Sequence, residues 1–239
     1  YDLSGKWEET WRVGQLNFDV EYEIVEGLTA KALASYYYAT QELNNHEFTY
    51  KLYGYNDEDD TYPVIFENQN PWRERRMGHI EEVTTNVQLN YNKEWGNHTF
   101  TILGGLETIT RDAPTTWVHS IPTANSLTLI DYETLDTYDD VGDNTQARLG
   151  YIGRLTYDYG QRYLLELAAR YDGSWKFPPG NRWGFFPSVS AGWRISEETF
   201  WENGALGSVI PDLKLRGSFG ILGDDDVGGY APFDYLAGY

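Results

Sequence analysis

The sequence predicts an all-β fold, an antiparallel transmembrane β-barrel segment of about eight strands with short turns at one end and long loops at the other. Three observations predict this fold. Apolar and polar residues alternate with a period of two in one segment after another, the connections differ in length at the two ends, and aromatic residues gather near both ends of the segments. A period of two places successive side chains on opposite faces of a strand. Outer-membrane barrels combine all three features.

The composition excludes several classes of protein. The 18 Lys and Arg against 37 Asp and Glu give a net charge of −19, which argues against binding nucleic acid, because basic side chains supply most of that affinity. The chain has no cysteine, so it forms neither a disulfide framework nor a Cys-based zinc site. The mean hydropathy of −0.57 does not exclude a membrane protein, because barrel strands alternate polar and apolar residues.

The alternating segments follow one another along the whole chain. Their apolar residues are, in order, Phe18, Val20, Tyr22 and Ile24; Val87, Leu89, Tyr91 and Trp95; Leu149, Tyr151, Leu155, Tyr157 and Tyr159; Tyr163, Leu165, Leu167 and Tyr171; Phe185, Val189, Ala191 and Trp193; and Leu213, Leu215 and Phe219. Residues 28–55 and 75–95 exceed the usual five to six residues of globular strands. They suit strands that cross a bilayer with roughly 9–11 residues and continue into solvent.

The connections support the same interpretation. Short turns are expected at residues 26–27, 95–98 and 159–162, all rich in turn-forming residues. Long polar excursions are expected at residues 56–72, 111–145 and 173–182 and from residue 223 onward, and residues 196–212 are expected to form a longer turn with a helical piece. Two alternatives remain open: a secreted acidic β-sandwich that binds or cleaves polysaccharide, with the aromatic residues in its core, and a complete small barrel with a structural or adhesive role.

The second half of the sequence resembles the barrel of the SusC/RagA family of TonB-dependent outer-membrane transporters. The matching runs are RLGYIGRLTYDY (148–159), RYLLE (162–166), RYDGS (170–174), NRWGFFPSVSAGWRIS (181–196), LKLRGSFG (213–220) and GDDDVGGY (223–230). The match from Arg148 to Tyr230 is specific, and shorter matches precede it at residues 22–28, 89–92 and 104–107.

The resemblance implies a barrel of roughly 22 strands whose lumen holds a plug. It implies import of a nutrient too large for porins, a glycan or oligosaccharide or else a peptide, across the cell outer membrane with energy delivered through TonB. It also implies a SusD-like surface lipoprotein as partner, no cofactor and no enzymatic activity. The sequence shows no plug domain, TonB box or C-terminal closing strand, so residues 1–239 are expected to be a partial barrel within a longer polypeptide, with the TonB complex contacted through the missing N-terminal part.

Charged residues alternate into the presumed lumen. They are Arg148, Arg154, Glu166, Arg170, Asp172, Arg194, Lys214 and Arg216. We expect them to form cross-strand ion pairs and to contact the plug, in preference to direct contact with substrate.

Aromatic residues in the outer loops are the candidates for substrate binding. Trp117, Trp175, Trp183 and Tyr230 could stack on sugar rings, and the alternative is that they belong to an interfacial girdle or contact the lid protein.

The acidic residues suggest no catalytic site. They lie in loop runs without the apolar pocket that tunes a catalytic carboxyl group. Asp224, Asp225 and Asp226 are a weak candidate for Ca²⁺, and an ordinary polar loop is the favoured interpretation. The four histidines lie in different segments without metal-ligand spacing, so no metal site is expected.

Overall fold

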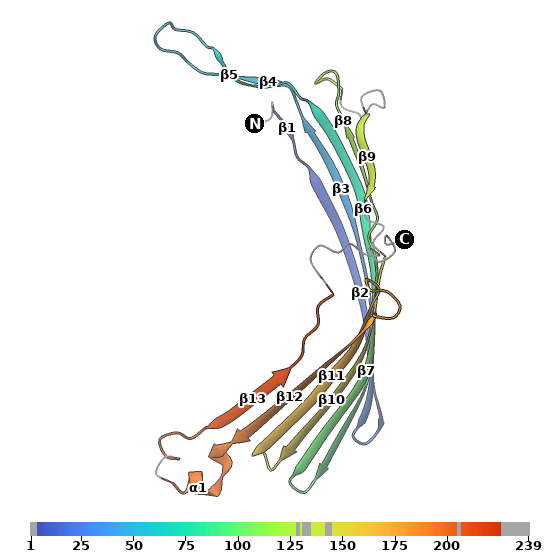
Figure 1. The fold of residues 1–239 in the computed structure, drawn as a ribbon, viewed down its shortest axis with the longest axis vertical. Coiled ribbons are helices and arrows are strands. Elements are labelled where there is room, and N and C mark those ends of the chain that lie inside the picture. Colours follow the sequence, from blue (N-terminus) through green and yellow to red (C-terminus); the bar gives the residue numbers. More distant parts are fainter. Residues whose placement is uncertain (1–3, 128–129, 131–134, 142–144, 205–206, 226–239) are drawn as a thin grey trace. The chain divides into compact units, whose positions relative to one another are not determined.

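Antiparallel strands make up most of the chain (Figure 1). The computed structural model describes residues 4–127, 130, 135–141, 145–204 and 207–225. Its strands are β1 (Gly5–Lys6), β2 (Glu9–Val25), β3 (Leu28–Glu47), β4 (Tyr50–Tyr53), β5 (Val64–Asn68), β6 (Trp72–Trp95), β7 (His98–Asp112), β8 (Thr115–Ser120), β9 (Leu135–Val141), β10 (Gln146–Tyr159), β11 (Tyr163–Ser174), β12 (Trp183–Arg194) and β13 (Lys214–Gly220). A 3-10 turn η2 (Ile195–Glu197) and a short helix α1 (Thr199–Glu202) follow β12.

One sheet contains all strands except β4 and β5, which pair with each other. Its order is β1-β3-β6-β7-β10-β11-β12-β13, with β2 also paired to β3, and β8 paired to β6 and β9. Within the part of the chain that the structure describes, eight strands succeed one another as hairpins: β2, β3, β6, β7, β10, β11, β12 and β13. These eight match the predicted number of about eight, and β1, β4, β5, β8 and β9 were not predicted as separate strands.

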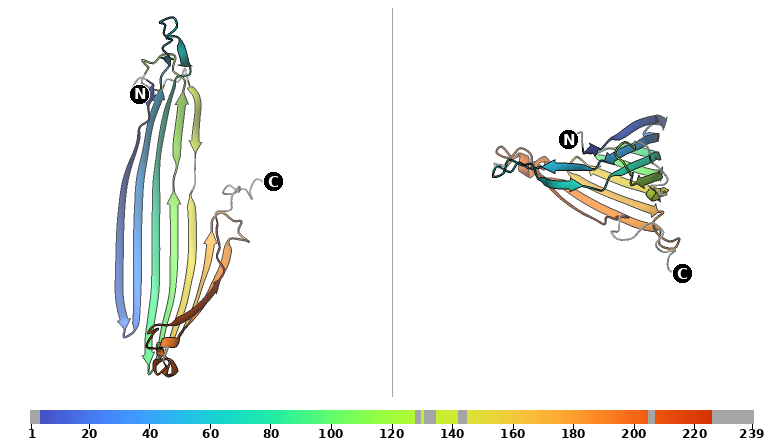
Figure 2. Two further views of the ribbon diagram at one scale, coloured as in Figure 1. Left: turned by 90° about the vertical axis from the view of Figure 1, so that its left-hand side faces the viewer. Right: turned by 90° about the horizontal axis from the view of Figure 1, so that it is seen from above.

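The chain divides into two units, and the long strands contribute residues to both. The first unit contains Tyr1–Gln15, Tyr37–Glu82 and Arg111–Thr145, and the second contains Leu16–Tyr36, Val83–Thr110 and Gln146–Tyr239. In the second unit, β10 to β13 (yellow to red) lie side by side in one layer (Figure 2).

The expected short turns are present. Gly27, Gly96 and Gly160 have φ angles of 81°, 58° and 56°, a left-handed conformation that glycine adopts without a steric penalty. Gln161 also has a positive φ, 59°, so two consecutive left-handed residues join β10 to β11. That geometry belongs to the tight turns that match the twist of a hairpin. The longer turn expected after residue 196 contains η2 and α1, as predicted.

The predicted loop at residues 111–145 is partly wrong. β7 continues to Asp112, and β8 and β9 form ladders inside this range. β8 pairs with β6 from Arg73↔Ser120 to Gly78↔Thr115, and with β9 on its other edge. The polar composition indicated a loop. The N-terminal part of β6, however, extends beyond its pairing with β7, and β8 forms hydrogen bonds with the backbone groups that would otherwise lack partners there. The range 56–72 likewise contains β5 and the start of β6.

Few side chains are buried, because the described strands form a single layer without a second layer against them. The buried apolar residues of the described part are Ala39, Leu43 and Trp175, and the buried polar ones are Asn45, Arg73, Ser120, Ser174 and Ser196. Many large apolar side chains are exposed on the strands instead. None of the helices within the described ranges has the length and apolar content needed to cross a membrane.

Candidate functional site

The register of β10 to β13 separates the second unit into two faces. Directly paired residues share a face of a sheet. One row runs Leu155, Leu167, Val189 and Phe219 across the four strands, and it belongs to the face that we call the apolar face. The opposite face, here called the polar face, carries all eight of the predicted lumen residues: Arg148, Arg154, Glu166, Arg170, Asp172, Arg194, Lys214 and Arg216. These eight residues share one face of the sheet, and the prediction that this face lines a lumen and contacts a plug stays a prediction.

Ion pairs connect the polar face from strand to strand. Arg154 and Glu166 lie 2.6 Å apart between β10 and β11, and Arg170 contacts Asp172 at 3.0 Å and Glu107 of β7 at 3.0 Å. Arg194 pairs with Glu197 beyond the end of β12 at 3.2 Å. The arginine side chains of these pairs are 31–52% exposed, so each pair contributes at most about 1 kcal/mol. Arg154–Glu166 and Arg170–Glu107 join two strands, whereas Arg170–Asp172 lies within β11 and Arg194–Glu197 lies at the end of β12. A continuous ladder of cross-strand pairs stays a prediction.

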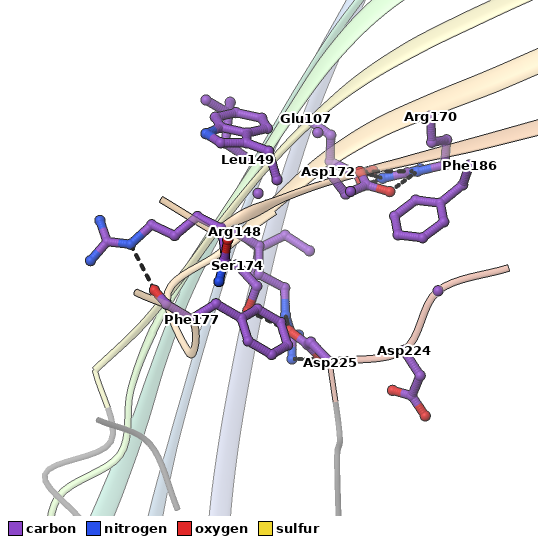
Figure 3. Close-up of a pocket in the computed structure, with 18 residues that line it drawn as sticks. Glu107, Arg148, Leu149, Arg170, Asp172, Ser174, Phe177, Phe186, Asp224 and Asp225 are labelled. Carbon is purple, nitrogen blue, oxygen red and sulfur yellow. Dashed lines mark hydrogen bonds and ion pairs between the residues drawn. The ribbon is translucent and has the colours of Figure 1, made fainter. Parts of the chain in front are cut away.

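A pocket of about 460 Å³ lies where β10, β11 and β12 approach the 175–182 connection (Figure 3). Most of its charged residues belong to the polar face, and Leu149, Gly173 and Trp183 of the apolar face also line it. Its lining combines both signs of charge with aromatic rings: Glu107, Ile109, Arg148, Leu149, Gly150, Arg170, Asp172, Gly173, Ser174, Phe177, Asn181, Arg182, Trp183, Gly184, Phe186, Gly223, Asp224 and Asp225. Such concave sites with few converging polar groups are typical of small-ligand binding. The pocket is our candidate functional site.

The best-defined polar contact in the pocket joins Arg148, Ser174 and Asp225. The Arg148 guanidinium donates from Nε to Asp225 Oδ2 at 2.8 Å and from Nη2 to Oδ1 at 3.0 Å. Ser174, which lies opposite Arg148 in the register, donates its hydroxyl to Oδ2 at 2.8 Å. Burial of the Asp225 carboxyl raises its pKa, but the hydrogen bonds from Arg148 and Ser174 outweigh this, and the net pKa lies below the ordinary value.

Three glycines that line the pocket leave room for neighbouring side chains. A Cβ on Gly223 or on Gly184 would overlap the ring of Phe186. At Gly150 a Cβ would overlap the side chains of Asp172 and Arg170. The absence of side chains at these positions therefore makes room for the Phe186 ring and for the Arg170–Asp172 pair.

The structure describes three of the four candidate loop aromatics, Trp117, Trp175 and Trp183. Trp183 is the first residue of β12, and its ring stacks on Tyr171 at 4.8 Å and on Tyr151 at 5.9 Å between centroids. The interfacial girdle, the alternative interpretation of Trp183, stays a prediction. Trp175 is 8% exposed, so its ring offers little surface to a sugar, and Trp117 lies half-buried in β8 of the first unit. Tyr230 lies outside the described residues, and contact of these residues with substrate stays a prediction.

The carboxylates of Asp224 and Asp225 do not converge. Asp225 is directed to Arg148, whereas Asp224 points away from it (Figure 3). Asp226 lies outside the described residues. Within the described ranges, no group of three His, Cys, Asp or Glu side chains is arranged to hold a metal ion. Asp225 thus forms a salt bridge with Arg148, which the sequence did not predict.

The sequence did not single out several residues of the pocket. Ser174 could have been found from the turn at residues 159–162, because that turn fixes which residues of β10 and β11 are opposite each other. Phe177 and Phe186 had no distinguishing pattern, and Glu107 reaches Arg170 from β7, which is distant in sequence.

A single layer of antiparallel strands, with one exposed apolar face and one charged face, defines the wall of a membrane β-barrel. The family model described as "TonB dependent receptor-like, beta-barrel" matches residues 2–221. The chain therefore belongs to the TonB-dependent receptor-like β-barrel family and forms part of an outer-membrane barrel, not of an enzyme. This membership overturns the secreted β-sandwich alternative.

Curated relatives and solved structures agree with this assignment. The chain is 44% identical over 91 residues to the TonB-dependent receptor SusC of Bacteroides thetaiotaomicron, covering 38% of this chain and 9% of SusC. It is 28% identical over 222 residues to the TonB-dependent receptor P39 of Formosa agariphila, covering 88% of this chain and 19% of P39. The structure of the RagAB peptide transporter is similar with a TM-score of 0.73 at 19% identity, covering 95% of this chain and 24% of that one. The chain thus spans about a tenth to a fifth of the length of these two curated relatives.

Proposed function

We propose that this chain is part of the barrel of a SusC/RagA-type importer, which takes up a nutrient too large for porins across the outer membrane. The observation that carries the proposal is the family match over residues 2–221 together with the 44% identity to SusC. In this proposal the polar face of β10 to β13 lines the lumen and contacts a plug, and the apolar face contacts lipid. Residues 1–239 are then one part of a longer polypeptide that also supplies the plug, the TonB box and the closing strand.

The proposed substrate is an oligosaccharide, with a peptide as the second candidate. The oligosaccharide proposal rests on the resemblance to the SusC/RagA family and on the aromatic candidates Trp117, Trp183 and Tyr230; Trp175, the fourth candidate, is too deeply buried to add support. The peptide candidate is supported by the similarity to the RagAB peptide transporter, a likeness of fold at 19% identity. The proposed partners are a SusD-like surface lipoprotein and the TonB complex, the latter contacted through the N-terminal part of the longer polypeptide.

The test is uptake by whole cells. A strain lacking the gene of the full-length protein, and a matched strain lacking TonB, are compared with the parent for uptake of fluorescently labelled oligosaccharide and peptide mixtures. We expect both deletions to abolish uptake of one of the two mixtures and to leave porin-permeable monomers unaffected. Uptake of both mixtures that is equal in the parent and in the gene deletion would contradict the import proposal.

A further inference from the structure

Arg148 and Ser174 present three hydrogen-bond donors to a single carboxylate. The donors are Nε and Nη2 of Arg148 and the hydroxyl of Ser174, at 2.8–3.0 Å from the two oxygens of Asp225. The planar guanidinium matches a carboxylate in two parallel hydrogen bonds, which adds geometric specificity to the charge. The structure therefore contains a formed carboxylate receptor, and the chain's own carboxylate occupies it.

The donors of this contact lie on paired strands, whereas the acceptor, Asp225, does not. Arg148 and Ser174 lie opposite each other on β10 and β11, in a ladder that continues through twelve paired positions to the turn at Tyr159↔Tyr163. Asp225 lies beyond the end of β13, in a segment without regular secondary structure. Between that strand and Asp225, the Ile221 amide donates to the Pro187 carbonyl at 2.9 Å and Gly223 lies against Phe186. Displacing Asp225 breaks no strand pairing, whereas displacing the donors disrupts the sheet.

The receptor opens onto a space that can hold more than one carboxylate. The pocket of about 460 Å³ continues from Arg148 past Leu149 to the rings of Phe177 and Phe186. The lining contains two other arginines. Arg170 is paired with Asp172 and Glu107, both on paired strands, and Arg182 donates from Nε to the Phe177 carbonyl at 2.9 Å. Arg148 differs from Arg170 because its carboxylate partner, Asp225, lies in a segment without regular secondary structure and not on a paired strand.

We propose that Arg148 and Ser174 form a binding subsite for a carboxylate group of the imported substrate, and that Asp225 occupies this subsite in the empty protein. The inference rests on the proposed import function and adds a substrate class to it: oligomers that bear a carboxylate. Two sources share this chemistry, the carboxyl terminus or acidic side chain of a peptide and the uronate of an acidic oligosaccharide. Because Asp225 is tethered, it competes at a high effective concentration, and the substrate gains access as the 221–225 segment withdraws.

The test uses the full-length protein in detergent and two pairs of probes. One pair is a tetrapeptide with a free carboxyl terminus and the same peptide amidated; the other is tetragalacturonate and its methyl ester. Titration calorimetry on the wild-type protein is expected to show that one free acid binds at least about tenfold more tightly than its blocked counterpart. The pair that discriminates identifies the source of the carboxylate.

Variants assign this discrimination to the subsite. Arg148→Gln should abolish the preference for the free acid, and Asp225→Asn should strengthen binding of the free acid about tenfold by removing the tethered competitor. Arg216→Gln, on the same face but outside the pocket, is the matched control and should change neither value. Circular dichroism and heat-dependent gel mobility verify that each variant is folded.

A distance measurement reports on the segment without relying on affinity. Spin labels at Leu222→Cys, where the native side chain is 95% exposed, and at Thr156→Cys on β10 should give one narrow distance in the empty protein. The distribution should broaden in Asp225→Asn and on addition of the free acid.

Three results would overturn the subsite: wild-type protein that binds neither free acid better than its blocked form, discrimination that survives Arg148→Gln, or a label distance unchanged by the acid and by Asp225→Asn. TonB-dependent uptake by the same cells keeps the two proposals distinguishable. If the binding tests contradict the subsite but the parent strain still shows TonB-dependent uptake, the import function stands without the subsite. The import function itself is contradicted only if the gene-deletion strain takes up both mixtures as well as the parent does.

Discussion

Arg73 shows how one side chain organises the first unit. The guanidinium is 5% exposed and donates to the backbone carbonyls of Glu47, Trp72, Asn125 and Leu127 at 3.0–3.3 Å. It also lies over the Phe48 ring, 5.0 Å from the centroid. Since burial of an unpaired charge is costly, these contacts hold the end of β3 and the 121–127 segment to the start of β6.

Arg73→Lys should loosen this arrangement. A guanidinium presents several donors in one plane, whereas a lysine ammonium is a single compact group. The ammonium cannot reach all four carbonyl groups, so some of them lose their hydrogen-bond donors. We expect a loss of about 2–3 kcal/mol in the local stability of the first unit, measured as faster proteolytic cleavage within residues 121–127 of the full-length protein. Arg12→Gln, which removes an exposed pair with Glu42, is the control and should have little effect. Equal cleavage rates for the two variants would contradict the role assigned to Arg73.

Because the pKa of Asp225 is lowered in the folded chain, the attachment of the 221–225 segment to Arg148 should depend on pH. A carboxyl group whose pKa is lower in the folded chain contributes stability above its unfolded pKa, near 3.8, and loses that contribution as the pH falls through the folded pKa. We therefore expect a spin label at Leu222→Cys to remain immobilised from neutral pH down to about pH 4 and to gain mobility at lower pH. In the Asp225→Asn variant the label should be mobile throughout, and a transition that persists in this variant would assign the effect to another group.

Strand alternation makes opposite predictions for the two faces. Leu155 and Leu167 pair on the apolar face, and Thr156 pairs with Glu166 on the polar face. Leu155→Arg or Leu167→Arg should lower the unfolding free energy of the full-length barrel in lipid vesicles by about 2–4 kcal/mol if the residue lies near the bilayer midplane. Thr156→Arg should cost less, because its charge lies opposite a carboxylate. Urea-induced unfolding followed by tryptophan fluorescence measures the difference, and equal losses on both faces would contradict the assignment of the apolar face to lipid.

The exposed apolar face also governs how the isolated chain behaves in solution. Large side chains such as Leu167, Phe185, Leu215 and Phe219 are 43–73% exposed. Exposed apolar surface and unpaired strand edges both promote association. We expect the 239-residue chain alone to sediment as large aggregates in aqueous buffer and as smaller species in detergent. A monodisperse, β-rich monomer in detergent-free buffer by analytical ultracentrifugation would contradict this expectation.

The net charge of −19 is distributed unevenly over the molecule. Acidic residues are concentrated in loop segments such as 57–60 and 224–226, whereas the polar face of β10 to β13 carries arginines and a lysine beside its carboxylates. Because an overall charge is a sum over all these segments, it argues against nucleic acid as a partner but says nothing about the chemistry of the pocket.

Strand periodicity and turn chemistry were sufficient to predict the succession of long strands in the sheet, because both are local properties. Alternation assigned eight charged residues to one face, and the short turn at Gly160 and Gln161 fixed the register that brings Ser174 opposite Arg148. The pairing of β8 with β6 and β9, the burial of Trp175 and the contact of Asp225 with Arg148 could not be predicted in this way. They depend on where irregular segments return to the sheet, over a separation of 77 residues for Arg148 and Asp225. Such returns follow from long-range packing and charge pairing, for which no period in the sequence exists.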